Sequence, residues 1–463
     1  MTAQTILPAN SVTGGFEVAN SLRFDDGSSD SLSLSVSGTS QTTAGTISFW
    51  FKRGALSTDQ RVWINYVDAN NYGAIKLQSD NKMEVVVVDG GSVTGKLVTN
   101  RLFRDCSAWY HCCVAINSSD GTAGNRMRLY INGTEETSFA TDTNPDSGVT
   151  MEFFTDGTNK IGQMNNDQYF DGYIAEFVMI HGSQLTPSSF GEFDEDSGIW
   201  KPKNVSGLSF GSKDYYLEFK QAGTSQNSSG MGADTSGEDN HFAVSNLTAV
   251  DQATDTCTNN FCTMNPLIPT TNATFSQGNC KLTIGGSSIQ GAGIGTFGLT
   301  AGKWYFEVKL LADKDNHTHG AISELTAELN ANVTAIQNDV GVTSWINGDG
   351  GEVVVDGTAT TADYGIMAEN SIMGIALDID NYNITYLDDN SALVSNFNMS
   401  STRGTIFPLI KMGINCAAEV NFGGCSAFAV SSANSDADGH GNFEHAPPSG
   451  YFAICTKNLA EYG

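Results

Sequence analysis

The stretch TISFWFKRG, Thr46–Gly54, alternates apolar and polar residues and so places Ile47, Phe49 and Phe51 on one face. This period of two is typical of a β-strand with one buried face. Further stretches of the same kind follow at the spacing of a strand plus a turn: AIKLQSD, KMEVVVVDGG, WYHCCVAIN and NRMRLYINGTEE. In the last of them, Asn132-Gly133 signals a hairpin turn. The pattern predicts a first domain of antiparallel strands over residues 17–200.

The composition indicates the same fold class for the whole chain. Of the 463 residues, 50 are Gly, and charged residues make up only 16%. Gly, Ser, Thr and Asn disfavour helix interiors and supply turns. We therefore predict an all-β protein with two antiparallel β-sandwich domains, joined by an irregular connector and carrying one short inserted helix.

Changes in the pattern mark the predicted domain boundaries. Residues 1–16 are polar and are predicted to be an N-terminal docking arm. The periodicity weakens over residues 201–265, which we interpret as an ordered but irregular connector. A second β unit is predicted over residues 266–463. Within it, AISELTAELNANVTAIQN (Ala321–Asn338) has apolar residues at steps of three and four, which predicts the inserted helix.

The charge and hydropathy of the chain exclude several classes of partner. The formal net charge is −28 at pH 7. A field of this sign repels nucleic-acid phosphates and anionic membrane surfaces, so we expect no nucleic-acid partner. The chain has no apolar run of the length that crosses a bilayer, and its N-terminal stretch lacks a basic segment. We therefore expect neither membrane insertion nor a signal peptide.

The nine cysteines are predicted to be mostly reduced, buried thiols. Cys112 and Cys113 are adjacent, so they face opposite sides of one strand. The spacing of Cys257 and Cys262 does not match a zinc knuckle, and no second pair follows at a metal-site distance. Such thiols act as small apolar residues and suit a protein assembled in a reducing cytoplasm.

The acidic stretch NSIMGIALDIDNYNITYLDDN, Asn370–Asn390, predicts a hairpin. Its alternation places the apolar residues on one face and Asp378 and Asp380 on the other. A calcium loop of the EF-hand type needs Gly at its sixth position and Glu at its twelfth, where this chain has Asn383 and Asp389. Calcium binding by a set of neighbouring loops stays an open alternative.

No catalytic residues are predicted. A retaining glycoside hydrolase needs two carboxylates about 5–5.5 Å apart. The nearest stretch, GEFDEDSG, has Glu192 and Asp194 but has Ser197 where a second Glu is needed. A G-x-S-x-G turn between a strand and a helix is also missing from the sequence. We therefore expect a protein that is not an enzyme and that needs no cofactor.

Aromatic side chains on loops are the candidates for ligand binding. Sugar binding needs aromatic faces beside planar polar groups. Tyr66, Tyr72, Tyr169 and Trp345 are predicted to be such loop residues. By contrast, the tryptophans that lie in predicted strands are interpreted as core residues: Trp50, Trp109 and Trp304.

One acidic, histidine-containing stretch is a candidate metal site. In DADGHGNFEH, the side chains of Asp436, Asp438 and His440 offer oxygen and nitrogen ligands within a short stretch. A polar loop without a metal is the alternative.

The segments ISFWFKR, WYHCCVAINSS, MRLYINGTEE and FDGYIAEFVMIHGSQLTPSSF stand in the order found in laminin-G-like, concanavalin A-like domains. Residues 17–200 therefore resemble that family, which implies a jelly roll of two antiparallel sheets, often used to bind carbohydrate or protein. The segments GKWYFEVKL, DVGVTSW, SIMGIALDIDNYNITYLDDN, IFPLIKM and AEVNFGG resemble a SPRY (B30.2-like) domain over residues 266–463. This second resemblance implies another β-sandwich, with binding through loops.

The combination of both domains with SGIWKPK, DTSGEDNHF and DQATDTCTNNFCTMNP between them resembles virion adhesins of tailed bacteriophages, particularly of marine hosts. The resemblance implies a tail fibre or receptor-binding protein on the virion surface, made in the host cytoplasm, that attaches the particle to a host-surface glycan or protein. It also implies docking to other virion proteins through the N-terminal arm, and a homo-oligomer, a trimer as in many fibres. Two alternatives stay open: a structural capsid or tail decoration protein without receptor binding, and a polysaccharide depolymerase.

Overall fold

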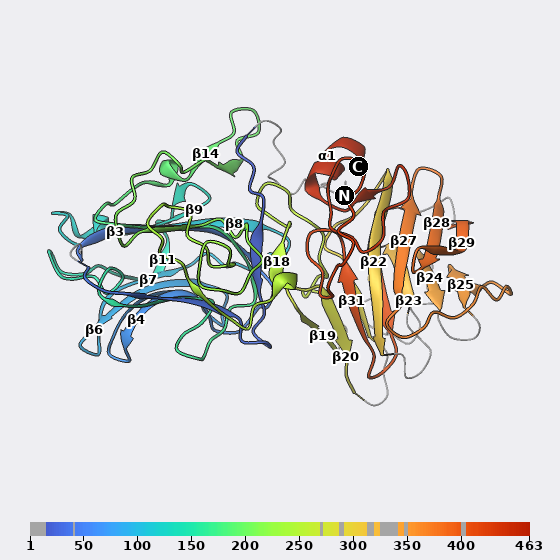
Figure 1. The fold of residues 1–463 in the computed structure, drawn as a ribbon, viewed down its shortest axis with the longest axis horizontal. Helices are drawn as coiled ribbons and strands as arrows, with labels where there is room; N and C mark the ends of the chain where they lie inside the picture. Colours follow the sequence, from blue (N-terminus) through green and yellow to red (C-terminus); the bar gives the residue numbers. More distant parts are fainter. Residues whose placement is uncertain are drawn as a thin grey trace. The chain divides into compact units, whose positions relative to one another are not determined.

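The computed structural model describes residues 15–39, 42–268, 272–286, 291–312, 319–324, 341–346, 351–399 and 404–463. The docking arm expected over residues 1–16 lies outside this part except for its last two residues. The chain divides into two compact units, Val12–Thr258 and Asn259–Gly463, which we name the first and the second sandwich. Antiparallel sheets make up both units, so the predicted all-β fold class is confirmed (Figure 1).

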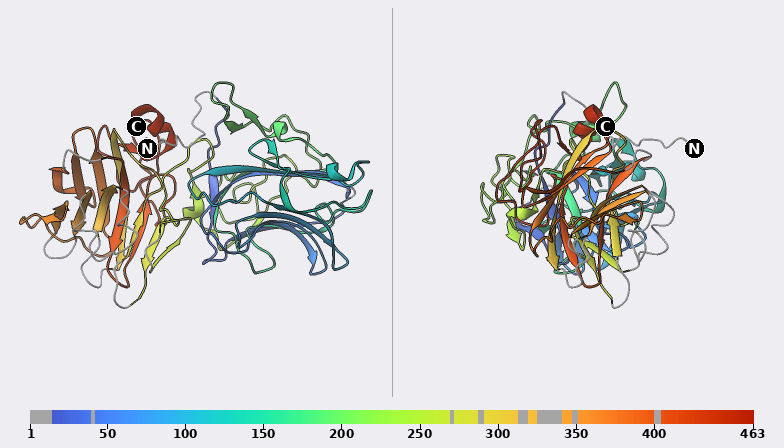
Figure 2. Two further views of the ribbon diagram at one scale, coloured as in Figure 1. Left: turned by 180° about the vertical axis from the view of Figure 1, so that it is seen from behind. Right: turned by 90° about the vertical axis from the view of Figure 1, so that its right-hand side faces the viewer.

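The first sandwich contains two large sheets, which we name after a central strand. The β3 sheet has the order β10 (Thr134–Glu135), β9 (Met127–Ile131), β8 (Trp109–Asn117), β3 (Ala44–Arg53), β13 (Gly172–His181), β1 (Ser21–Phe24) and β18 (Gln252–Ala253), with β16 (Tyr215–Leu217) paired to β13. The β5 sheet has the order β11 (Phe139–Thr143), β7 (Ser92–Thr99), β6 (Met83–Asp89), β5 (Asn71–Leu77), β4 (Gln60–Asp68), β12 (Gly157–Ile161), β2 (Ser31–Val36) and β17 (Ala243–Ser245). The blue and teal strands form these two layers, seen from behind in Figure 2.

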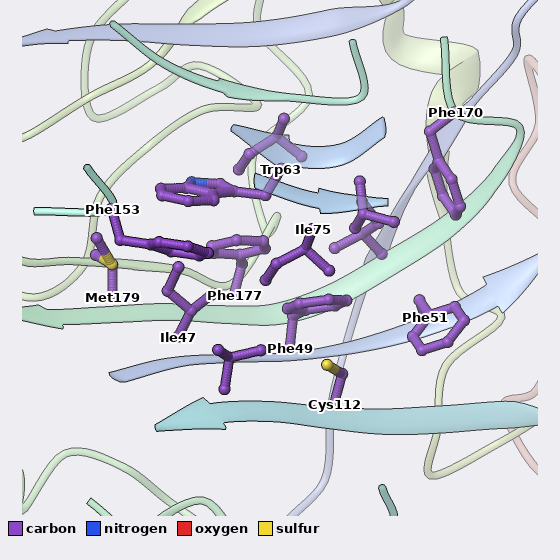
Figure 3. Close-up of a cluster of buried hydrophobic side chains, with 14 of the residues drawn as sticks. Ile47, Phe49, Phe51, Trp63, Ile75, Cys112, Phe153, Phe170, Phe177 and Met179 are labelled. Carbon is purple, nitrogen blue, oxygen red and sulfur yellow. The ribbon is translucent and has the colours of Figure 1, made fainter. Parts of the chain in front are cut away.

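The hydrophobic core lies between the two sheets. Ile47, Phe49 and Phe51 all face it, as the alternation predicts. Phe49 of β3 stacks on Phe177 of β13, with ring centroids 5.2 Å apart (Figure 3). Cys112 belongs to this core and Cys113 to a cluster on the outer face of the β3 sheet, so their opposite orientation is confirmed. All nine cysteines are buried thiols that form no disulfide, as predicted.

Most of the stretch interpreted as a connector belongs to the first sandwich instead. Residues 201–258 contribute β16, β17 and β18, which pair with β13, β2 and β1. Residues 259–265 belong to the second sandwich. The predicted boundary at residue 200 is thus corrected. The reason is that strands of two or three residues leave no periodicity to read, although their pairing completes both sheets.

The outer face of the β3 sheet is covered by the chain that follows it. Phe190 and Val205 pack there against Cys113 and Val178. This covering chain includes the short helix η2 (Pro187–Ser189) and the hairpin of β14 (Gly191–Phe193) and β15 (Trp200–Pro202). Two more short helices lie elsewhere in the unit: η1 (Ala123–Asn125) and η3 (Ala249–Asp251).

The second sandwich also has two sheets. The β22 sheet has the order β19 (Ala273–Ser276), β20 (Lys281–Ile284), β31 (Ala417–Asn421), β22 (Lys303–Ala312), β27 (Ile372–Asp378), β28 (Asn383–Asp388) and β29 (Ser391–Asn398), with β32 (Phe452–Ala453) parallel to β22. The β30 sheet has the order β21 (Gly291–Ile294), β30 (Ile406–Met412), β23 (His319–Glu324), β24 (Val342–Ile346), β25 (Glu352–Val355) and β26 (Thr358–Ala359). Helix α1 (Thr456–Tyr462) ends the chain.

The structure confirms the acidic hairpin. It contradicts the predicted inserted helix in the residues that it describes. Strands β27 and β28 pair around the turn, and Ile375 and Leu377 face the core. The helix expected over Ala321–Asn338 is wrong at its start, because residues up to Glu324 form strand β23. Its remainder, residues 325–338, lies outside the described residues. None of the helices that the structure describes has the length and apolarity to cross a membrane.

Candidate functional site

Two of the predicted aromatic residues lie side by side on the first sandwich. Tyr66 on β4 is directly opposite Tyr72 on β5 in the antiparallel register. Directly opposite residues project from the same face of a sheet and are close enough to contact each other. Both rings are half-buried. They belong to strand ends rather than to the loop itself, which here is the short turn between β4 and β5.

An apolar cluster supports the two rings. Ile64, Ala74, Val86 and Val88 are buried on the outer face of the β5 sheet, and Tyr66, Tyr72 and Met164 pack against them. The core-facing residues of the same strands alternate with these, as in any sheet with two faces. The tyrosines are therefore held on a firm base with part of each ring exposed.

Lys160 and Asn165 complete the group. The Lys160 ammonium lies 5.3 Å from the centroid of the Tyr66 ring and donates to Asn165 Oδ1 at 3.3 Å. The Asn165 amide in turn donates to the Tyr66 hydroxyl at 3.4 Å. Burial lowers the pKa of Lys160. We name Tyr66, Tyr72, Lys160, Met164 and Asn165 the tyrosine patch.

Charged residues surround the patch on the same sheet. The Arg61 guanidinium donates to Gln168 Oε1 at 3.2 Å, while its Nε and Nη1 are buried without a hydrogen-bond partner. Glu84 accepts from Lys96 at 2.7 Å and from Gln78 at 2.7 Å. Lys76 pairs with Asp59 at 3.0 Å. This outer face thus carries aromatic, amide and cationic groups over an apolar base.

The other two aromatic candidates are placed differently. Trp345 is not a loop residue: it lies in β24, is fully buried and packs in the core of the second sandwich, so this prediction is wrong. The turn-rich residues that follow it made it look like a loop residue. Tyr169 does lie in a loop, between β12 and β13, and is half-buried, but it is not part of the cluster under Tyr66 and Tyr72. Trp50, Trp109 and Trp304 are buried, as predicted.

The residues of the weak metal prediction are engaged in the protein's own hydrogen bonds. Asp436 is buried, and its Oδ1 accepts from the backbone N–H groups of Asp438 and His440 at 3.0 and 2.9 Å. Its Oδ2 accepts from the Ala453 N–H at 2.9 Å and the Asn458 amide at 2.8 Å. Asp438 instead accepts from the Tyr462 hydroxyl. The Asp436 carboxylate therefore organises the loop, and the three side chains do not converge on one point.

A different acidic group lies at one end of the first sandwich. Asp25 and Asp26 follow β1, Asp171 precedes β13, and one oxygen of each lies within 4.8 Å of the others. In the described ranges, this is the one set of three His, Cys, Asp or Glu side chains close enough to share an ion. Burial, together with the charges of Asp26 and Asp25, raises the pKa of Asp171 well above 3.8. Burial also raises the pKa of the nearby Asp30 to about 6.

Replacing Asp171 by Asn is expected to stabilise the first sandwich increasingly as the pH rises. The folded state holds the Asp171 proton more tightly than the unfolded state does. The wild type therefore loses stability as the pH rises from about 4 to the raised pKa of Asp171. Asn has no proton to lose. Urea unfolding of both proteins at about pH 4 and about pH 8 measures the difference, which should be near zero at the lower pH. A bound cation at this group would reverse the result: Asp171→Asn would be less stable, and a chelator would lower the stability of the wild type.

The remaining acidic candidates have structural partners. Asp194 accepts from Ser197 N and Oγ and from Lys201, and the Ser197 backbone bond above all lowers its pKa to about 2. Asp378 binds Lys303 at 2.9 Å and Asn381. The contacts of Asp378 fit the interpretation of its stretch as a hairpin.

Comparison with known proteins finds one family similarity, which lies in the first sandwich. Residues 26–189 match the family model described as the concanavalin A-like lectin/glucanases superfamily. No curated protein sequence matches the chain. Among solved structures, the SPRY domain of human HERC1 matches at 13% identity and a TM-score of 0.30, over 36% of this chain and 99% of that one.

Two further structures match at a similar level. The TRIM65 PSpry domain is 12% identical with a TM-score of 0.30, over 35% of this chain and 91% of that one. The native heptameric SAP-like pentraxin from Limulus polyphemus is 16% identical with a TM-score of 0.29, over 37% and 80%. The two-layered antiparallel fold of the first sandwich agrees with the similarity of residues 26–189 to the concanavalin A-like lectin/glucanases superfamily.

Proposed function

We propose that the protein is a bacteriophage virion surface protein, a tail fibre or receptor-binding protein, that attaches the particle to a host-surface glycan. The observation that carries the glycan part is the tyrosine patch on a concanavalin A-like lectin/glucanase domain. Half-exposed aromatic rings beside an amide and an ammonium offer what a sugar needs, namely a flat apolar face and hydrogen-bonding groups around it. The phage assignment rests on the resemblance in sequence described above.

The proposed protein binds and does not catalyse. Glu84, a carboxylate on the outer face of the β5 sheet, is already engaged by Lys96 and Gln78. A single shallow patch gives weak binding, so several copies on one particle, as in a trimer docked through the N-terminal arm, would multiply it. The free, buried cysteines suit assembly in a reducing host cytoplasm before release.

Replacing Tyr66 by Ala is expected to weaken glycan binding by about tenfold, which corresponds to about 1.4 kcal/mol. The loss arises because the variant removes the aromatic face and the support for Lys160. Tyr66→Phe is the matched control, since it keeps the ring and loses only the hydroxyl. The measurement is saturation binding of fluorescent protein to host and non-host cells, with intact virions as competitor.

The outcomes separate the proposal from its alternatives. Host-restricted binding that virions compete for, and that Tyr66→Ala weakens more than Tyr66→Phe, supports the proposal. Absence of binding by folded protein favours a structural decoration protein. Release of reducing ends from host polysaccharide would instead establish a depolymerase and contradict the non-enzymatic assignment.

A further inference from the structure

The surroundings of the Lys160 ammonium differ from those of most paired lysines in the described residues. The part of the chain that the structure describes places no carboxylate within 4.0 Å of its ammonium, which contacts a tyrosine ring and an amide oxygen instead. Lys76, Lys96 and Lys303 all have carboxylate partners, at 3.0, 2.7 and 2.9 Å. Lys213 and Lys309 likewise have no carboxylate within 4.0 Å among the described residues, so Lys160 is distinguished by its position beside Tyr66 and Asn165.

The surroundings of Lys160 favour an anion. Four cations lie on the outer face of the β5 sheet: Arg61, Lys76, Lys96 and Lys160. Asp59 and Glu84 neutralise two of them. Glu84, Asp59 and Asp167 also lie near Arg61 and offset part of its charge. Lys160 therefore remains as the positive end of the tyrosine patch, and its partial burial strengthens its attraction for a ligand charge relative to that of a fully solvated lysine.

Arg61 is a second cation on this face that favours an anionic ligand. Its side chain is only 3% exposed, yet two of its nitrogens have no hydrogen-bond partner. A buried guanidinium with unmet donors raises the positive potential of the face above it, because nothing in its contacts accepts those hydrogens. The residues that cover it, Met164 and Gln168, come from the loop that also carries Asn165.

We infer that the tyrosine patch takes an anionic sugar, with Lys160 as the partner of its carboxylate or sulfate. This inference rests on the proposed glycan binding and specifies its substrate class. The sugar ring lies on the exposed tyrosine faces, and the Asn165 amide hydrogen-bonds a hydroxyl. Because the net charge of −28 opposes the approach of long polyanions, the fitting ligand is a short stretch with one acidic sugar at the patch.

The test uses an array of oligosaccharides in matched pairs: uronate-bearing members with their methyl esters, and sulfated members with their desulfated forms. The full-length wild type is expected to bind one acidic class about tenfold more tightly than its neutral partner. Lys160→Met keeps the aliphatic stem and is expected to abolish this preference, so that the acidic and the neutral member of each pair bind the variant equally. Lys303→Met is the control, because Lys303 also lies over a tyrosine ring, 5.8 Å from the Tyr451 centroid, but is paired with Asp378.

Each result decides a separate point. Equal binding of acidic and neutral partners, or a preference that survives in Lys160→Met, overturns the anionic-sugar inference and leaves glycan binding intact. Loss of the preference in Lys303→Met as well would place the effect outside the patch and also overturn the inference. Binding to no member at all overturns both the inference and the glycan binding on which it rests. Which pairs show the preference tells a carboxylate from a sulfate.

Discussion

Replacing Asp255 by Ala is expected to lower the free energy of unfolding of the first sandwich by about 3–5 kcal/mol. Asp255 Oδ2 accepts from the Lys52 ammonium at 2.8 Å, and its Oδ1 accepts from the Trp109 indole at 3.0 Å. The Lys52 and Asp255 side chains are 1% and 0% exposed. Removing the carboxylate leaves a buried ammonium and a buried indole N–H without this partner, and water cannot reach them.

Asp59→Ala is the matched control for this variant. Asp59 also pairs with a lysine, Lys76 at 3.0 Å, but its side chain is 41% exposed, so its loss should cost less than about 1 kcal/mol. Urea unfolding followed by circular dichroism measures both, and only the transition of the first sandwich should shift. If Asp255→Ala cost no more than Asp59→Ala, residues 201–258 would not be an integral part of that sandwich.

The sequence predicts the strands well where a strand is long enough to alternate. Ile47, Phe49 and Phe51 share a face in the structure because a strand of ten residues with one buried side imposes that pattern. The hairpin around Asp378 is predictable for the same reason. In contrast, β17 and β18 pair with β2 and β1 at the other end of the domain's sequence, and β16 pairs with β13 across the whole β14–β15 hairpin. No local pattern reports such partners.

The two errors arise where tertiary pairing overrides a local pattern. Ile322 stands at helical spacing to later apolar residues, but it is buried in β23 next to β30, because sheet pairing outweighs a weak helical preference. Trp345 precedes an Asn, Gly and Asp run that is typical of a loop, yet it is the last residue but one of β24. Tertiary pairing decides both positions.

The candidate site was only half predictable. Tyr66 and Tyr72 could be found because they are aromatic residues on either side of a turn. Lys160 and Asn165 could not, because they reach Tyr66 only through the register of β12 with β4, almost a hundred residues along the chain. A binding group that spans two strands so far apart is set by the sheet order.

Replacing Asp436 by Ala is expected to destabilise the second sandwich by about 3 kcal/mol or more. The four N–H donors that its carboxylate accepts come from its own loop, from β32 and from α1, so the variant leaves all of them unmet in a mostly buried place. Thermal unfolding of the wild type and the variant, each with and without a chelator, measures the effect.

Asp438→Ala is the control: it removes an exposed carboxylate with one Tyr462 contact and should cost less than about 1 kcal/mol. A shared metal would give a different pattern, in which the chelator lowers the stability of the wild type and both variants lose that response. We expect the chelator to have no effect, since the donors already satisfy the Asp436 carboxylate and hold the loop to the C-terminal segment.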